Sequence, residues 1–372
     1  MKGYQKYIAA GAGFLIVIVL CSAFHKKQSF SSLKTSSPFP FGAAVNPALL
    51  QNNAAYRHIA ETEFNSLTAE NALKWAGVHP AENTFDFTKG DILVDFAMAH
   101  HQRFHGHNLC WYQGNPAWLQ HFTGDSLAWE QLFKTHIETV VAHYKGKITS
   151  WDVVNEAFGE DGTLRVEDTN PADNKDDGCI WARHLGKDYV ARAFIYAHAA
   201  DPKALLFYND YAQETSPAKL AAVINMVSDF KRRHIPINGL GLQMHINIYT
   251  PQNGITNALT QLAATGLQIH ISELDISVNP HNEAGISYSA ELQDRQAAMY
   301  SFLVTQYAGI VPKKQQYGIT TWNVGDADSW IPHFFKRKDW PLLFDSNYTP
   351  KPLYDTVRQA LKHLTPAKAG RP

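Results

Sequence analysis

The sequence has little cysteine and almost no surplus of charge. Its 372 residues include three cysteines, and one of them, Cys21, lies in an apolar N-terminal segment. At most one disulfide, between Cys110 and Cys179, is left for the rest of the chain, and nothing in the sequence demands it. The formal net charge is −1. Because binding to nucleic acid phosphates favours a basic surface, this balance argues against a nucleic acid partner.

Motifs for metals, phosphates and repeats are also missing. No Cys/His cluster has zinc-ligand spacing, and no glycine-rich loop is built to hold a phosphate. We therefore expect neither a metal nor a cofactor. No sequence repeat is visible, which argues against a solenoid.

The N-terminus has the pattern of an export signal. Basic residues flank an uncharged run, in the order Lys2, Lys6, residues 7–24, Lys26 and Lys27. Such a pattern is typical of a signal peptide or a short signal anchor. Cleavage after Ala23 fits a small-x-small site, and Cys21 leaves a lipoprotein as an alternative. We expect residues 1–27 to export the chain to the periplasm, the cell surface or the medium, with a membrane tether if the segment is retained.

The remaining sequence divides into three parts. Residues 28–40 are rich in Ser, Thr and Pro and are predicted to form a linker. Residues 41–364 are predicted to form one domain, because strand-like runs alternate there with helix-like stretches. Residues 365–372 are expected to be a tail, and the protein is expected to be a monomer.

The 41–364 region contains eight apolar, strand-like runs. They lie at residues 40–46, 64–70, 103–111, 150–157, 204–211, 239–247, 268–276 and 318–325. Helical periodicity appears between most of them, for example at residues 217–234. Eight β-then-α units predict an α/β fold, the (β/α)8 barrel.

Polar and aromatic residues gather where these runs end. They are Glu70, Asn71, His107, Trp111, Asn155, Glu156, Asn209, Asp210, Gln243, His245, Glu273, Asp275 and Trp322. One polar residue at a strand end is usually a cap or a turn residue. Barrel enzymes, however, take their catalytic groups from the C-terminal ends of several strands, so the repeated pattern predicts a site there.

Two of these residues are glutamates that suit glycoside hydrolysis. Glu156 closes the run WDVVNE, and Glu273 lies in HISELDI. Such hydrolysis needs one carboxyl that protonates the departing sugar oxygen and a second that attacks the anomeric carbon or directs a water at it. A hydrogen bond from His245 would keep Glu273 ionised. An ion pair with a purely structural role is the alternative reading of the two glutamates.

The tryptophans divide into two groups. Trp111, Trp322 and Trp330 lie at or after strand ends, where indole faces could pack against a sugar ring. Core packing is predicted for the others, Trp118, Trp129, Trp151 and Trp181.

Several ordered motifs resemble those of the glycoside hydrolase family 10 endo-β-1,4-xylanases, over about residues 41–361. The motifs are FNSLTAENALKW (64–75), HGHNLCWYQGNPAW (105–118), WDVVNEAF (151–158), GLQMHIN (241–247), ISELDI (271–276) and TTWNVGDADSW (320–330). The resemblance implies a retaining mechanism, with Glu156 as general acid/base and Glu273 as nucleophile. Xylan or a xylooligosaccharide would be the substrate.

The resemblance also implies roles for the other residues. Glu70, Asn71 and Lys74 would bind the sugar two places from the cleavage point. The sugar at that point would be surrounded by Lys74, His107, Trp111, Asn155, Gln243, His245 and Trp322, with Trp330 covering it. Asp275 and Asn209 would be supporting residues, and Asp275 would orient Glu273 or His245.

This chain departs from the family pattern near the site. Tyr112 and Gly114 stand where the family usually has His and Gln, and Asn323 stands where it usually has Gly. The first two changes bear on the hydrogen bonds around His107. The charged loop at residues 159–179 either shapes the leaving-group sugar sites or is a solvated loop.

Three alternatives to a xylanase stay open. One is another retaining barrel glycosidase, such as a β-glucanase or an enzyme for short xylooligosaccharides. Another is a non-catalytic carbohydrate-binding protein, against which the presence of both glutamates argues. The third is a membrane-tethered surface protein, which concerns location only.

Overall fold

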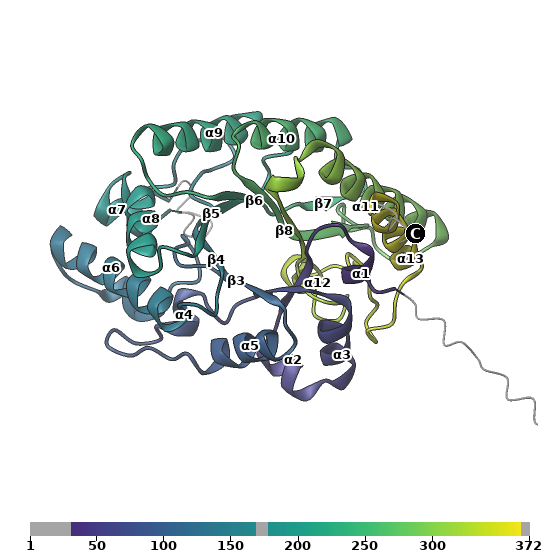
Figure 1. Ribbon diagram of the computed structural model, residues 1–372, viewed down its shortest axis with the longest axis horizontal. Helices are drawn as coiled ribbons and strands as arrows, with labels where there is room; N and C mark the ends of the chain where they lie inside the picture. Colours follow the sequence, from purple (N-terminus) through teal and green to yellow (C-terminus); the bar gives the residue numbers. More distant parts are fainter. Residues whose placement is uncertain (1–30, 169–177, 366–372) are drawn as a thin grey trace, which may run out of the picture. The chain divides into compact units, whose positions relative to one another are not determined.

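The computed structural model describes residues 31–168 and 178–365 (Figure 1). By its internal contacts the chain divides into Met1–Ser31 and Ser32–Pro372. The predicted export segment at 1–27 lies outside the described residues, as do residues 366–372 of the predicted tail. No helix within the described ranges is long and apolar enough to cross a membrane.

The second unit is a closed parallel barrel, which confirms the predicted (β/α)8 fold. Its strands are β1 (Phe41–Val45), β2 (Ser66–Ala69), β3 (Arg103–His107), β4 (Ser150–Asn155), β5 (Leu205–Asp210), β6 (Gly239–Leu242), β7 (His245–Asn247), β8 (Gln268–Ser277) and β9 (Gln316–Thr321). Each strand from β1 to β5 pairs in parallel with the next, β6 pairs with β8, and β9 pairs with both β8 and β1. The barrel is therefore closed by eight strands, which are all of those named except β7, and it has no free edge.

The sixth predicted run, at residues 239–247, is split into β6 and β7. Met244 has a φ of 60°, in the left-handed region that a β-branched or bulky residue rarely adopts. This backbone turn ends β6 before Gln243. β7 then resumes beside β8, with His245 opposite Asp275. The break thus brings His245 next to the strand that carries Glu273.

Helices surround the barrel (Figure 1). They are α1 (Leu33–Ser36), α2 (Pro47–Asn52), α3 (Ala54–Glu63), α4 (Trp75–Val78), α5 (Thr88–Ala99), α6 (Ser126–His143), α7 (Ile180–Leu185), α8 (Tyr189–Ala200), α9 (Pro217–Arg232), α10 (Gln252–Ala264), α11 (Ala290–Ile310), α12 (Trp330–Phe335) and α13 (Pro352–Leu364), with short 3₁₀ turns η1 (Ala117–His121) and η3 (Lys313–Gln315).

Helix α9 illustrates how the sequence specifies these elements. Its N-cap Ser216 accepts a hydrogen bond from the backbone N–H of Lys219, and Pro217 occupies the first turn, where its missing N–H costs nothing. The buried face carries Leu220, Val223, Val227 and Phe230, at the helical spacing seen in the sequence. Packing of this stripe against the barrel holds the helix in place.

The predicted core tryptophans do lie in the core. Trp129, Trp151 and Trp181 are buried, and Trp118 is half-buried against the same cluster, with its indole N–H donating to the carbonyl of His79. The two body cysteines, Cys110 and Cys179, are both buried and free, so they do not form a disulfide.

The linker prediction is wrong from Ser32 onward. Leu33 is 0% exposed and Phe39 is 4% exposed, because both apolar side chains pack into the core. α1 contacts α3 and α13, and the backbone N–H of Leu33 donates to Glu63 at 2.9 Å. Ser, Thr and Pro dominate the composition of this stretch, but these two apolar residues fix its position.

Candidate active site

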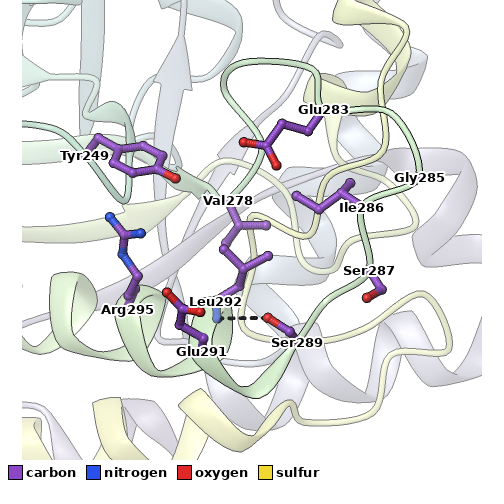
Figure 2. Close-up of a pocket in the computed structure, with 10 residues that line it drawn as sticks. All are labelled: Tyr249, Val278, Glu283, Gly285, Ile286, Ser287, Ser289, Glu291, Leu292 and Arg295. Carbon is purple, nitrogen blue, oxygen red and sulfur yellow. Dashed lines mark hydrogen bonds between the residues drawn. The ribbon is translucent and has the colours of Figure 1, made fainter.

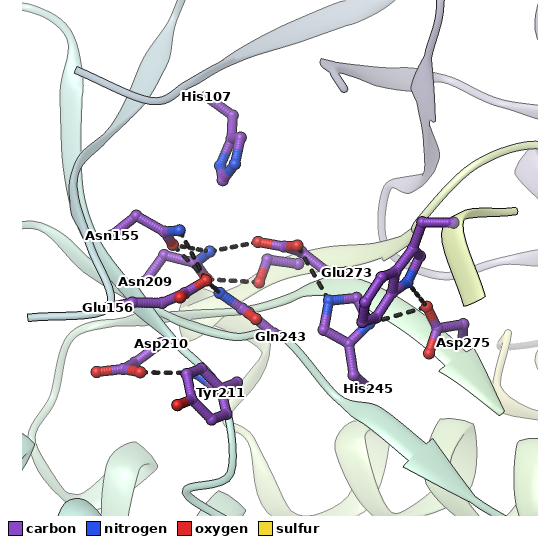
Figure 3. Close-up of polar contacts among 12 residues, drawn as sticks. His107, Asn155, Glu156, Asn209, Asp210, Tyr211, Gln243, His245, Glu273 and Asp275 are labelled. Carbon is purple, nitrogen blue, oxygen red and sulfur yellow. Dashed lines mark hydrogen bonds and ion pairs between the residues drawn. The ribbon is translucent and has the colours of Figure 1, made fainter. Parts of the chain in front are cut away.

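The predicted strand-end residues converge at one end of the barrel (Figure 3). Asn155 ends β4, Asn209 lies near the end of β5, and Gln243 follows β6. β7 contributes His245, and β8 contributes Glu273 together with Asp275. Because all strands of the barrel are parallel, their C-terminal ends lie at the same end of the barrel, which we call the mouth. Side chains that are far apart in sequence become neighbours there.

Glu156 is held by three neutral donors. The indole N–H of Trp111 donates to its Oε2 at 2.9 Å, and the amides of Asn155 and Gln243 donate to its Oε1 at 2.9 and 2.7 Å. The carboxyl is 8% exposed. Its backbone has a φ of 59° and donates its N–H to the carbonyl of Asn209, so the chain turns sharply as β4 ends. This turn holds the glutamate at the mouth.

Glu273 has a different environment. It is 4% exposed, and its Oε1 accepts a hydrogen bond from the Asn209 amide at 2.7 Å. Its Oε2 lies 3.2 Å from Nε2 of His245. Burial by itself would raise the pKa of Glu273, but the His245 hydrogen bond and the charges of His107 and His245 hold that pKa below its ordinary value. Glu273 is therefore the readily ionised carboxyl.

His245 is held between two carboxylates. Nδ1 of its ring lies 2.8 Å from Oδ2 of Asp275, which also accepts a hydrogen bond from the indole of Trp330 at 2.8 Å. Burial lowers the pKa of His245, but Asp275 and Glu273 together raise it to about 10. A doubly protonated ring can donate to both carboxylates at once. The expected contact of His245 with Glu273 is thus present, and Asp275 contacts His245.

Carboxamides join the two glutamates into one network. The Asn209 amide donates both to Glu273 and to Oδ1 of Asn155 at 2.8 Å, and Gln243 reaches the same oxygen at 3.2 Å. Ser272 donates to Oδ1 of Asn209 at 2.6 Å, which fixes the orientation of that amide. Asn209 is therefore the direct link between the surroundings of Glu156 and Glu273.

A second group lies on the β2 and β3 side of the mouth. Nζ of Lys74 donates to Oδ1 of Asn71 at 2.8 Å and lies 4.7 Å from the ring centre of Trp111 and 5.8 Å from that of Trp322. Burial lowers the pKa of Lys74, against the opposing charges of Glu273, Glu70 and Glu156. A half-buried ammonium between two indoles offers donors beside apolar faces, which suits a sugar ring with its hydroxyls.

His107 is fixed by a residue that sequence reasoning missed. Its Nδ1 lies 2.9 Å from Asp152, whose other oxygen is 3.0 Å from Nε2 of His105. Burial favours the neutral acid, yet the two histidines hold the pKa of Asp152 well below its usual range. Asp152 lies in the middle of β4 and not at its end. The available signal was a charged residue between two apolar ones, Trp151 and Val153, in the middle of a strand.

Tyr112 contacts the loop after β4. The guanidinium of Arg165 lies 4.4 Å from the ring centre of Tyr112 and donates to the hydroxyl of Tyr211 at 2.7 Å. Arg165 and Tyr211 also line a cavity of about 630 Å³ with residues 159–167. Sequence reasoning noted Tyr112 and the loop separately but did not connect them, because only the fold brings them together.

The other two departures lie elsewhere around the mouth. Gly114 has a φ of 66°, and an added Cβ would lie 3.3 Å from the Trp111 ring and 3.6 Å from Cβ of Lys74. It therefore borders Lys74 and Trp111. Asn323 has a φ of 85° and is fully buried. That backbone conformation suits Gly, and Asn is among the residues that tolerate positive φ best.

In the parts of the chain that the structure covers, no group of three or more His, Cys, Asp or Glu side chains could hold a metal ion. At the mouth, the ring of His245 instead lies within hydrogen-bond distance of two carboxylates, those of Asp275 and Glu273.

Comparison with known proteins gives one family. The model for glycosyl hydrolase family 10 matches residues 31–360. Endo-1,4-beta-xylanase B of Paenibacillus barcinonensis is 37% identical over 332 residues, which are 86% of this chain and 95% of that protein. Endo-1,4-beta-xylanase A of Cellvibrio japonicus is 37% identical over 349 residues, which are 89% of this chain and 56% of that protein.

Solved structures agree with the sequence comparison. A mutant xylanase10C from Cellvibrio japonicus in complex with xylopentaose has a TM-score of 0.83 and 34% identity, and the match covers 90% of this chain and 70% of that one. Family match, identity and fold coincide over nearly the whole described barrel. The chain belongs to glycosyl hydrolase family 10.

Proposed function

We propose that the protein is a retaining endo-β-1,4-xylanase in which Glu273 is the nucleophile and Glu156 is the general acid/base. The observation that carries this assignment is the unequal surroundings of the two carboxyls. Glu273 is hydrogen-bonded to the cationic ring of His245, whereas Glu156 accepts from one indole and two amides. Glu273 is therefore the better-stabilised anion, and the proton carrier is Glu156.

The reaction proceeds in two displacements. In the first, Glu156 gives its proton to the departing glycosidic oxygen while Oε of Glu273 attacks the anomeric carbon, which breaks the glycosidic bond and forms a glycosyl–enzyme ester. In the second, Glu156 takes a proton from water, and that water attacks the same carbon and releases Glu273. The anomeric configuration is retained because it is inverted twice.

The side chains around the mouth would hold the sugar at the cleavage point. Trp111 and Trp322 present indole faces with Lys74 between them, and Trp330 is fixed over His245 by its bond to Asp275. Further along the same side, Asn71 is exposed next to Lys74. The carboxylate of Glu70 accepts a hydrogen bond from the amide of Asn46. Carboxylate and amide groups beside indoles suit a neutral sugar chain.

Xylan is the substrate class that the relatives favour. The named relatives are xylanases, and the similar solved structure holds xylopentaose. On the leaving-group side, we assign the cavity beside Arg165 and Tyr211 to the first sugars beyond the cleavage point, because it adjoins the chain that leaves Glu156.

Export is proposed on the sequence pattern of residues 1–27 alone, with the periplasm, the cell surface or the medium as the destination. Fractionation of cells that express the full chain would test it, and enzyme found only in the cytoplasm would contradict it. A monomer is proposed as well, and sedimentation of the purified protein is the corresponding measurement.

The decisive experiment measures the products that the purified protein releases from xylan, from mixed-linkage glucan and from xylobiose. Short xylooligosaccharides from xylan alone are the expected result, with the β-anomer appearing first in an NMR time course. Activity on glucan alone would overturn the substrate. Early appearance of the α-anomer would overturn the retaining mechanism.

A further inference from the structure

Asp152 and the two histidines beside it lie inside the barrel, away from two cavities of the domain. One of these is the cavity at residues 159–167 described above. The other, of about 400 Å³, lies where the chain leaves β7 and β8, and Tyr249 borders it (Figure 2). Asp152, His105 and His107 line neither cavity, and each is at most 2% exposed. Their charges must therefore be balanced within the protein interior.

Strand register places Asp152 between the two histidines. β3 and β4 are parallel, with His107 opposite Asp152 and His105 opposite Ser150. Because alternate residues of a strand face the same side, the rings of His105 and His107 both enter the interior. Oδ2 of Asp152 lies 2.9 Å from Nδ1 of His107, and Oδ1 lies 3.0 Å from Nε2 of His105.

The two contacts of Asp152 differ in kind. Oδ2 is hydrogen-bonded to the ring of His107, whereas Oδ1 makes no hydrogen bond with any group in the parts of the chain that the structure describes. The ring of His105 is within ion-pair distance of Oδ1, so it acts on the carboxylate through its positive charge. A buried carboxylate without a cation takes up a proton more readily, so His105 governs whether Asp152 is ionised.

The other neighbours of His105 come from four strands. Nδ1 of His105 contacts the hydroxyl of Ser150 on β4 at 2.7 Å, and that hydroxyl contacts the hydroxyl of Tyr317 on β9. The ring of His270 on β8 lies 5.0 Å away between centres. Burial, together with the charges of His105 and of Arg103 on β3, holds the pKa of His270 well below its ordinary value. None of these neighbours is a carboxylate, so the negative partner of His105 is the aspartate on β4.

His107 links this arrangement to the mouth. Its ring points toward Asn155 and Glu273 (Figure 3), and its centre lies 5.1 Å from that of Trp322. As described above, the charge of His107 is among the causes that hold the pKa of Glu273 below its ordinary value. Nε2 of His107 lies 3.2 Å from the amide nitrogen of Asn108, so both edges of the ring are held. The ionised carboxylate at Nδ1 therefore fixes a ring that acts on the nucleophile.

We propose that His105 is a positioning residue of the hydrolysis: its charge keeps Asp152 ionised, and the ionised Asp152 holds His107 facing the sugar and Glu273. This inference rests on the proposed xylanase function, because it assigns a role in that reaction. His105 acts through Asp152 and not on the substrate, since its own ring is fully buried, two residues before His107 along β3.

The pH dependence of kcat/KM in His105→Gln tests the proposal. Glutamine carries no charge, so the pKa of Asp152 should rise toward the range in which the enzyme works. The acid limb of kcat/KM is expected to move to higher pH by about one unit, for xylan and for an aryl xylobioside alike. His105→Arg supplies a positive charge that does not titrate, so its acid limb should stay close to that of the wild type.

The matched control is His270→Gln. It removes a second fully buried imidazole from the same interior, one whose Nε2 contacts the hydroxyl of Thr320 at 2.8 Å. Whatever its effect on stability, the acid limb should stay in place. An unmoved acid limb in His105→Gln would show that His105 is only a packing residue and would overturn the proposal. Equal movement in His105→Gln and His105→Arg, or in His105→Gln and His270→Gln, would overturn it as well.

¹³C NMR of the side-chain carboxyls in the wild-type protein measures Asp152 without any substitution, and it decides the question where a variant does not fold. Burial favours the neutral acid, but the two histidines hold the pKa of Asp152 well below its usual range, so the carboxyl should stay ionised throughout the active pH range. Protonation of Asp152 within that range would overturn the proposal. A wild-type protein inactive on xylan and on the aryl xylobioside would instead overturn the proposed function, and the inference with it.

Discussion

At the scale of single residues, the site separates two chemically identical side chains by their partners. Glu156 and Glu273 are both nearly buried, yet only Glu273 contacts His245, whose own pKa is raised to about 10 by Asp275 and Glu273. Hydrogen bonds to the charged form stabilise that form, so identical residues can take different roles.

Substitution of each glutamate should separate these roles. Glu156→Gln is expected to lose roughly 10²- to 10⁴-fold in kcat on xylan, the usual contribution of a general acid. On an aryl xylobioside with a good leaving group its first step should survive, since little protonation is needed. Glu273→Gln should lose the first step on both substrates. Burst kinetics with the aryl glycoside is the measurement, and equal loss in both variants would refute the assignment.

Removal of the histidine charge should change the pH profile. His245 helps to hold the pKa of Glu273 below its ordinary value, so His245→Gln should raise that pKa. Because the nucleophile must be deprotonated, the acid limb of kcat/KM should move to higher pH. The matched control is His198→Gln, at an exposed position on α8. An acid limb that stays in place or moves to lower pH would contradict the proposed role of His245.

At the scale of elements, a buried ion pair joins α9 to the end of β5. Lys219 donates to Asp210 at 2.9 Å, and both side chains are 0% exposed. Burial raises the pKa of Asp210 to about 6, although Lys219 opposes this shift. Tyr208 bonds Asp210 and also accepts from the backbone N–H of Ala157, so this pair lies directly behind the turn at Glu156.

Removal of one partner of that pair should destabilise the protein. Lys219→Met leaves Asp210 buried without its cation and is expected to lower the free energy of unfolding by about 3 kcal/mol. For comparison, Arg233→Ala removes a cation that pairs with Asp188 at the solvent-exposed surface, and it should destabilise the protein much less than Lys219→Met. Urea unfolding measures both. Similar effects of the two substitutions would show that burial of the Lys219 pair does not matter.

At the scale of the whole barrel domain, the first and last helices of the described unit, α1 and α13, are in contact. α1 packs on α13, and the hydroxyl of Thr365 donates to the carbonyl of Ser36 at 2.8 Å. This contact joins positions 329 residues apart. Residues 32–40, which precede β1, therefore belong to the folded domain.

The Leu33 side chain provides the test. Leu33→Ala should lower the free energy of unfolding by roughly 2–5 kcal/mol, the cost of a cavity at a fully buried leucine. Leu127→Ala, at a leucine that is 75% exposed, should change it by less than about 0.5 kcal/mol. Thermal unfolding distinguishes the two. An unchanged melting temperature in Leu33→Ala would restore the interpretation of these residues as a linker.

The barrel and most of the site could be predicted because both depend on the order of strands and helices along the chain. Alternation of strands and helices predicts the fold, and parallel strands bring their C-terminal ends to one mouth. Glu156, Asn209, His245 and Glu273 could therefore be selected from their places at strand ends. Asp152 could not, because its neighbours along β4 are apolar and its partners come from β3.

The sequence by itself determined the alternation of strands and helices, the positions of the strand ends and the pair of glutamates. What only the tertiary structure decided is which side chains contact each other. The cation beside Glu273, the amide link through Asn209, the contact of Tyr112 with Arg165 and the packing of Leu33 all join distant segments. Periodicity specifies an element and the face it buries, whereas the partner of a buried polar group is set by where the closed barrel places its neighbours.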